Sequence, residues 1–360
     1  MIINRVFIKL FTFFLIWRLL LFAIAFAAPT FIVDFGAKFP YSQEELNSTG
    51  FPHYIWSFGN FDGVHYLRIA QDGYAYQFTQ TFFPFYPLLI KFFSIFTQGN
   101  LIISALIISN TAFLIALVLF YKLLAGIYNE KVAFWSCIFL LSFPTSFYFG
   151  SVYTESFFFL LVILAFYLYE KGNILGASIV GAASSATRLI GVFLAPSLIR
   201  NFKTRNLIPL IIVPLGLLIY MVYLKITFNN PFYFLTAQSI FGQERSTTQI
   251  ILLPQVFWRY VKILATTSGL PLFNAVLELS STIFAIILLI LASKKVKKEW
   301  LIFSWLAIIT PTLTGTLASM PRYILVAFPI YIVLAHIKST LINTTIFILL
   351  YLVITKTQTN

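Results

Sequence analysis

Long apolar stretches constrain this chain more than any other feature of its sequence. Examples are Phe7–Phe26, Leu101–Leu124 and Leu272–Ala292, and runs of about 18 or more mostly apolar residues are typical of membrane helices. Only 10% of the 360 residues are charged, whereas a soluble domain carries about 25%. The charged residues are too few to cover a globular surface, so the sequence predicts an all-α polytopic membrane protein.

The apolar segments differ in length, and the shorter ones are the informative ones. The first helix, Val6–Ala28, resembles a signal peptide, but its length favours an uncleaved membrane helix. Phe82–Phe96 is short and contains two prolines, which predicts an interfacial or re-entrant helix. Leu175–Ala186 and Leu189–Ile199 are each too short to cross a bilayer, so we expect a broken-helix hairpin with Arg188 near its tip. The remaining predicted spans are Leu101–Leu124, Val132–Phe149, Tyr153–Tyr169, Leu207–Ile226, Leu272–Ala292, Leu301–Leu317, Tyr323–His336 and Ile342–Ile354.

The balance of charge predicts the orientation of these spans. The chain has 24 basic and 11 acidic residues, a formal charge of +13, and lysine and arginine gather in the short cytoplasmic loops of membrane proteins. We therefore expect the basic loops to face the cytoplasm and the long segments at 31–80 and 228–269 to be extracytoplasmic loops. No basic face alternates with aromatic residues as a nucleic-acid platform requires, so we expect no nucleic-acid partner. A lone cysteine, Cys137, excludes an intrachain disulfide.

Groups that can carry chemistry are concentrated in the first long polar segment, which holds five of the 11 acidic residues and two of the three histidines. On a helix through Phe61–Tyr74, the side chains of Asp62, His65 and Ile69 share one face, and Tyr66 lies beside it. A carboxylate next to an imidazole is suited to general-base catalysis. The alternative, which spacing alone favours, is a helix N-cap at Asp62 with a solvated face.

Two further carboxylates lie at predicted membrane boundaries. Asp34 follows the first span, where it could bind a metal or an acceptor, or serve only as an interfacial charge. Glu155 opens an apolar helix just after Tyr153, and a helix dipole alone would favour an acid there. An acid at a membrane boundary is also energetically costly unless it is used, so both interpretations of Glu155 stay open.

Single arginines interrupt three apolar segments. Arg188 lies inside the predicted hairpin, and Arg322 enters a span just before Tyr323. A guanidinium group pairs well with phosphate, and an intramembrane arginine is a functional-site hypothesis by default. The alternative is that each side chain reaches out to lipid phosphate. Arg18, within the first helix, could pair with a carboxylate or reach the interface in the same way.

At these residues the chain resembles a known family. Phe-Asp-Gly-Val-His-Tyr-Leu-Arg-Ile-Ala-Gln-Asp-Gly-Tyr at 61–74, followed by Phe-Phe-Pro-Phe-Tyr-Pro at 82–87, is similar to the Trp-Asp-x-x-His-[Phe/Tyr]-x-x-Ile-Ala-x-x-Gly-Tyr…Phe-Phe-Pro-x-x-Pro signature of the PIG-V, or GPI mannosyltransferase 2, family and its prokaryotic relatives. Phe61 stands where that family usually has tryptophan. Shorter matches follow in family order at 143–157, 186–188, 230–238 and 321–329.

The resemblance implies a single GT-C-like membrane domain over 1–360, a bundle of about 10 to 12 transmembrane or re-entrant helices with a catalytic first loop at 31–80. It implies transfer of a sugar, mannose in the eukaryotic members, from a polyprenyl-phosphate donor to a lipid or glycan acceptor. Carried over, Asp62 is the catalytic aspartate with His65 beside it. The membrane expected is a prokaryotic plasma membrane, with the active site on its extracytoplasmic side.

The mechanism we expect is an inverting displacement at the anomeric carbon. Arg188 and Arg322 would bind the donor phosphate, and Tyr66, Tyr153 and Tyr323 would support the site. No cofactor is required, although Asp34, Asp62 and Glu155 offer hard oxygen ligands that could hold Mg²⁺ or Mn²⁺. The alternatives are a lipid or sugar transporter or flippase, which would explain broken helices, and a non-catalytic subunit of a membrane complex.

Overall fold

The computed structural model describes residues 2–32, 35–37, 41–200, 207–241, 245–247 and 249–336. Within these ranges the secondary structure is helical, with no strand, which confirms the all-α prediction. Four helical segments are long and apolar enough to cross a membrane: Val6–Phe31, Leu101–Ala125, Ile208–Phe228 and Gly269–Ala292. The predicted span Ile342–Ile354 and the candidate Asp34 lie outside the described residues.

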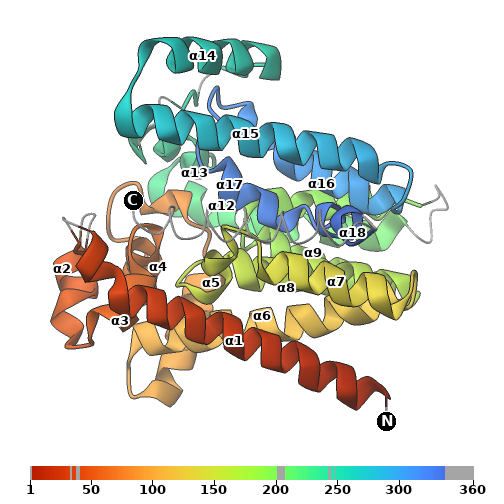
Figure 1. Ribbon diagram of the computed structural model, residues 1–360. Coiled ribbons are helices and arrows are strands. Elements are labelled where there is room, and N and C mark those ends of the chain that lie inside the picture. Colours follow the sequence, from red (N-terminus) through yellow and green to blue (C-terminus); the bar gives the residue numbers. More distant parts are fainter. Residues whose placement is uncertain are drawn as a thin grey trace.

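The long helices form the frame of a bundle. Helix α1 (Ile2–Phe31) lies on one side, against α6 (Leu101–Ala125) and α7 (Glu130–Leu141), as Figure 1 shows. Helices α14 (Leu253–Thr266) and α15 (Gly269–Ala292) form the opposite side. Between them pack α8 (Glu155–Glu170), α9 (Ile174–Ser185), α16 (Lys298–Thr312) and α18 (Pro329–His336). One continuous apolar core reaches from Leu10 to Leu334.

Prolines divide two of the predicted spans. The stretch Val132–Phe149 is not one helix, because α7 ends at Leu141 and the short η5 (Ser146–Gly150) follows Pro144. Proline lacks the amide donor that would continue the helix. Likewise, Tyr323–His336 is divided between α17 (Met320–Tyr323), η9 (Ile324–Val326) and α18. These interruptions place irregular backbone at one end of the bundle, where the charged residues meet.

The first polar segment folds into a series of short helices rather than a loose loop. They are α2 (Ser42–Glu45), η1 (Asn47–Thr49), α3 (His53–Trp56), η2 (Ser57–Gly59), α4 (Asp62–Asp72) and η3 (Thr79–Thr81). Arg68 joins α4 to α2, since its guanidinium pairs with Glu45 of α2 at 2.9 Å. The same guanidinium pairs with Asp72 within α4 at 3.2 Å. Helix α5 (Phe85–Ser94) is short and apolar, as predicted for Phe82–Phe96.

The predicted broken hairpin is present. Helix α9 ends at Ser185, and the chain resumes as η6 (Leu189–Phe193) and α10 (Leu194–Ser197). Gly191 makes the close return possible, because a Cβ there would lie 2.4 Å from the Ser184 backbone. Further along the chain, η7 (Ile208–Ile212) leads into α12 (Leu215–Phe228), which packs on α9. The second long segment, 228–269, also contains helix: α13 (Tyr233–Thr236), η8 (Ala237–Phe241) and α14.

Candidate functional site

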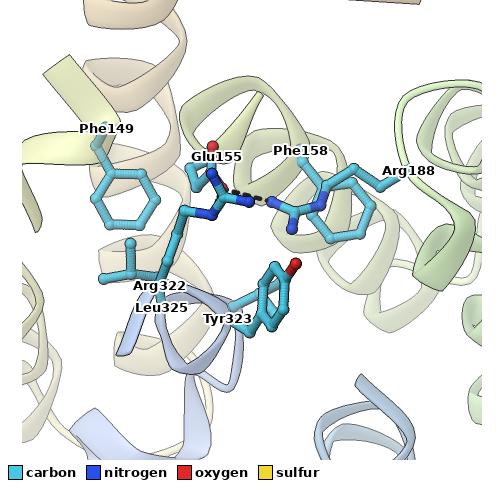
Figure 2. A pocket seen from close by; sticks show the side chains of 8 residues that line it. Phe149, Glu155, Phe158, Arg188, Arg322, Tyr323 and Leu325 are labelled. Carbon is cyan, nitrogen blue, oxygen red and sulfur yellow. Dashed lines mark hydrogen bonds and ion pairs between the residues drawn. The ribbon is translucent and has the colours of Figure 1, made fainter. Parts of the chain in front are cut away.

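Four charged side chains from distant parts of the sequence form one network, called the Asp62 network below. Arg322 lies between two carboxylates, with Nη1 2.5 Å from Asp62 Oδ2 and Nε 3.2 Å from Glu155 Oε1. Arg188 Nη1 donates to the same Glu155 oxygen at 2.8 Å. Figure 2 shows both guanidinium groups turned toward Glu155. The network alternates in sign and is neutral as a unit.

Asp62 is positioned by the backbone around it. It is the first residue of α4, preceded by Phe61 with a φ of 58°, a conformation uncommon for a residue other than glycine. The Val152 amide donates to the Phe58 carbonyl at 2.9 Å, and a Cβ on Gly63 would lie 3.1 Å from the Val152 carbonyl oxygen. The start of α4 therefore docks directly on the segment that leads into Glu155.

Glu155 and Arg188 both lie at helix ends. Glu155 is the first residue of α8 and is 4% exposed. Arg188 lies between α9 and η6, at the break of the hairpin, where its amide donates to the Ser184 carbonyl at 3.0 Å. A helix N-terminus favours a carboxylate, but the two arginine contacts show that Glu155 also has specific partners.

Arg322 is held from two sides. Thr145 Oγ1 donates to the Pro321 carbonyl at 2.7 Å. Upstream, Tyr260 of α14 binds the turn that precedes α17, because its hydroxyl accepts from the Leu317 amide at 3.0 Å. The tyrosine hydroxyl also donates to Glu278 of α15. Thr145 and Tyr260 thus fix the backbone on which Arg322 stands, and Glu278 fixes the Tyr260 hydroxyl.

Aromatic rings surround the guanidinium groups. The Tyr323 ring lies 5.5 Å from the Arg188 guanidinium carbon and 5.4 Å from that of Arg322. Tyr153 lies 5.6 Å from Arg322 and donates to the Asn60 carbonyl at 3.1 Å. Burial alone would raise the pKa of Tyr323, but the neighbouring guanidinium groups, Arg322 foremost, bring it below its ordinary value. Two of the three predicted supporting tyrosines therefore touch the site's cations.

The third supporting tyrosine, Tyr66, and the histidine, His65, lie on the same helix as Asp62 and pack against Phe82. Tyr66 is buried, with its ring edge-on to Phe82 at 5.1 Å. His65 is 4% exposed and stacks on the same Phe82 ring at 4.8 Å. Burial lowers the pKa of His65, and the nearby Asp62 charge offsets only part of that shift. His65 is thus neutral at pH 7 and within electrostatic reach of the Asp62 carboxylate.

The charge state of Asp62 follows from its neighbours. Burial would raise its pKa, but Arg322, through charge and a hydrogen bond, outweighs burial and brings the pKa below the ordinary value. His65 and Arg245 add smaller contributions in the same direction. Asp62 is therefore a carboxylate at neutral pH, with Oδ2 engaged by Arg322 and a side chain that is still 25% exposed.

Two cavities meet at Arg322. The smaller, about 10 Å³, is lined by Glu155, Arg188, Arg322 and Tyr323 together with apolar side chains, and is the one drawn in Figure 2. The larger, about 160 Å³, lies on the α15 side and is lined in part by Tyr148, Asn274, Glu278 and Arg322. Arg322 is common to both, so the network connects the two spaces.

Within the described ranges, the candidate oxygen ligands do not form a divalent-metal site. No group of three or more histidine, cysteine, aspartate and glutamate side chains comes together in the described ranges. Of the predicted oxygen ligands, Asp62 and Glu155 are both paired with arginine, and a metal would have to displace those contacts. Asp34 falls outside the described residues.

Sequence reasoning missed two charged residues that belong to this region. Glu278 is the single acid within the apolar helix α15, and an ionisable residue in a span is itself a signal that could have identified it. Arg245, in the second long segment, lowers the pKa values of Asp62 and Tyr323 through its charge. No local motif marked Arg245, because its relation to Asp62 depends on the tertiary fold.

Comparison with known proteins connects this geometry to a family. The family model described as mannosyltransferase (PIG-V) matches residues 6–195, more than half of the chain. A protein named GPI mannosyltransferase 2 from Cryptococcus neoformans var. neoformans serotype D is 27% identical over 143 residues, 37% of this chain and 34% of the relative. A Drosophila melanogaster protein of the same name is 25% identical over 109 residues, 28% of this chain and 24% of the relative. The matches thus span about a third or less of these relatives. No solved structure matches the chain.

Proposed function

The chain belongs to the mannosyltransferase (PIG-V) family, and from this premise we propose that it transfers mannose from a polyprenyl-phosphate donor to a lipid-linked or other extracytoplasmic acceptor, with inversion at the anomeric carbon. We place it in a prokaryotic plasma membrane, with a GT-C-type architecture. The observation that carries the proposal is the Asp62 network, which joins a partly exposed carboxylate to two arginines beside a cavity.

Asp62 is the group we assign to the acceptor. Its Oδ2 is held by Arg322, which leaves Oδ1 to accept a hydrogen bond from the attacking hydroxyl. The acceptor oxygen forms its bond to the anomeric carbon as the bond from that carbon to the phosphate oxygen breaks. The acceptor proton passes to Asp62, and the leaving group departs as polyprenyl phosphate, so the step balances. General-base assistance of this kind contributes about 10²–10⁴-fold to rate.

Arg188 and Arg322 are the groups we assign to the donor phosphate. A guanidinium has five N–H donors, and Arg188 uses one nitrogen on Glu155 while Arg322 uses two on its carboxylates. The remaining donors can bind phosphate oxygens, whose charge increases as the leaving group departs. A phosphate that draws Arg322 away from Asp62 would also raise the basicity of Asp62 at the moment when it takes the proton.

His65 supports Asp62 rather than the phosphate in this proposal. Its ring is packed on Phe82 and Phe241, so it can fix the start of α4 without moving. We propose that the reaction requires no cofactor. We therefore expect transfer to continue in the presence of EDTA, and loss of transfer on chelation would contradict this part of the proposal.

The test compares the Asp62→Asn variant with wild type in lipid nanodiscs, using radiolabelled polyprenyl-phosphate mannose and lipid extract of the host as acceptor. We expect transfer by wild type and a loss of at least about 100-fold in the variant, the lower end of general-base contributions. Asp72→Asn is the matched control, since Asp72 ends the same helix and forms its ion pair with Arg68 rather than with Arg322. Equal transfer by Asp62→Asn and wild type would refute the assignment of Asp62. Absence of wild-type transfer with a full panel of donor sugars would refute the transferase itself.

A further inference from the structure

The larger cavity beside Arg322 has a wall that the family motifs do not contain. One side consists of consecutive turns of α15, from which Asn274 and Glu278 line the space. These two residues are four positions apart, so they lie on the same helix face. The lining also includes Tyr148 and Phe147, whose ring centroids lie 4.3 Å apart. Arg322 closes the end nearest the Asp62 network.

Glu278 is held in a fixed orientation rather than left to reach for solvent. Tyr260 donates to its Oε2, and the same hydroxyl lies 3.3 Å from Thr316 Oγ1 and accepts from the Leu317 amide. A carboxylate within an apolar membrane helix is energetically costly, and such residues usually face a cavity or a partner and mark a functional site. Tyr260 and the Ser319 backbone both hydrogen-bond the Glu278 carboxylate. Because its two oxygens together offer about four acceptor sites, the carboxylate can still accept a hydrogen bond from a ligand in the cavity that Glu278 lines.

The two cavities lined by Arg322 differ in volume. The smaller cavity has room for about one water molecule, because about 10–15 Å³ is the least that holds one. The larger cavity, about 160 Å³, is about sixteen times the volume of the smaller one, so of the two it is the one with room for a sugar ring. A donor phosphate held by Arg322 carries its sugar one bond away, and of the two cavities that Arg322 lines, the larger one can accept that ring.

The lining also has the chemistry that a sugar needs. Hexose hydroxyl groups both donate and accept hydrogen bonds, and a carboxylate next to a carboxamide on one helix face offers both functions. The apolar C–H face of a sugar ring packs on aromatic side chains, which Phe147, Tyr148 and Phe273 provide. A polyprenyl chain, by contrast, would leave Glu278 desolvated without a hydrogen-bonding partner from the ligand.

We propose that this cavity holds the sugar ring of the donor, with Asn274 and Glu278 binding its hydroxyl groups and Arg322 holding the phosphate at the inner end. The inference rests on the proposed transferase function, and it makes α15 the element that distinguishes one donor sugar from another. Tyr260 is then a positioning residue, because it acts on the sugar only through Glu278.

Cysteine protection tests occupancy of the cavity separately from transfer. The native Cys137 is fully buried, so wild type serves as the unlabelled blank for a water-soluble maleimide. Leu277→Cys places a thiol on the cavity wall, and Asn274→Cys replaces it if the first variant does not fold. Ser268→Cys is the matched control, because Ser268 is exposed, immediately precedes α15 and does not line the cavity.

The probes are a short-chain polyprenyl-phosphate mannose and the same polyprenyl phosphate without sugar. At a donor concentration about ten times its Kd, we expect labelling of the cavity cysteine to slow about tenfold and labelling of Ser268→Cys to stay unchanged. Equal protection by the sugar-free probe would overturn the inference, since lipid or phosphate would then fill the cavity. Retention of radiolabelled donor without any protection would overturn it while leaving the transferase proposal intact. Failure of wild type to retain the donor would overturn both.

Discussion

Helix α8 carries a carboxylate at each end, and the two carboxylates belong to two different charge networks. At its first residue, Glu155 takes part in the Asp62 network. At its last residue, Glu170 pairs with Arg200 at 3.1 Å and Lys297 at 2.6 Å. Arg200 continues to Glu299 at 2.7 Å, and these four residues are called the Glu170 network. Both networks alternate in sign and join distant parts of the chain.

The networks differ in exposure. The Arg200 side chain is 47% exposed and that of Lys297 is 27% exposed, whereas Arg188 and Arg322 are 18% and 15% exposed. Exposed pairs are screened by water and contribute about 0–1 kcal/mol. A buried charge without its partner costs several kcal/mol. At the Glu170 end of α8, the exposed ion pairs connect neighbouring parts of the chain. At the Asp62 end, similar but more buried ion pairs form a preorganised site that lines two cavities.

The largest difference between the networks should appear on removal of the central arginine. Arg322→Ala leaves Asp62 and Glu155 without their shared cation, so we expect a loss of about 3–5 kcal/mol in the free energy of unfolding. Transfer should fall at least about 100-fold, as for loss of one preorganised donor. Thermal unfolding in nanodiscs and the radiolabel assay measure these two effects. Arg200→Ala is the matched control in the Glu170 network, and an equal loss of stability in both variants would contradict the comparison.

The second prediction concerns pH. Because the pKa of Asp62 lies below its ordinary value of about 3.9, its carboxylate stabilises the fold above that ordinary pKa. This stabilisation is lost as pH falls through the lower, folded-state pKa. We expect wild type to be more stable than Asp62→Asn at pH 5–7, with the difference shrinking only below about pH 4. Unfolding midpoints measured across that range provide the check. A difference that already disappears near pH 6 would mean that Arg322 does not lower the pKa of Asp62.

The smallest effect is expected at the far end of α8. Glu170→Gln removes a carboxylate whose cationic partners are partly exposed, so the free energy of unfolding should change by less than about 1 kcal/mol. Transfer should remain at the wild-type level, whereas Glu155→Gln should lower it. The same two assays apply. A strong loss of transfer in Glu170→Gln would show that the two networks are coupled through the helix.

Local sequence patterns predicted the parts of the site that depend on local structure. The helix beginning at Asp62, the broken hairpin at Arg188 and the carboxylate that opens α8 could all be read from spacing and from charges in apolar surroundings. The pairing of Arg322 with Asp62 joins residues 260 positions apart, and no periodicity encodes such a contact. Sequence reasoning grouped these residues on one face, but which cation meets which carboxylate depended on the tertiary fold.

Other residues show where the sequence reasoning fell short. His65 shares a helix with Asp62 as expected, but its ring packs on Phe82, because the aromatic residues that follow α4 fold back over it. Glu278 was overlooked within a stretch interpreted only as a span, although its charge was visible. The role of Arg245 depends on how the second long segment returns toward Asp62, which no short motif specifies.

The length of α8 has a consequence for the depth of the two charge networks. Its 16 residues span about 24 Å at about 1.5 Å per residue, less than the roughly 30 Å of a typical hydrocarbon core. The neighbouring α6 has 25 residues and is long enough to cross that core. With both helices upright in a bilayer, the charged groups at the two ends of α8 are closer together than the two headgroup layers. At least one of the two networks is therefore recessed within the bundle, below the level of the nearest headgroups.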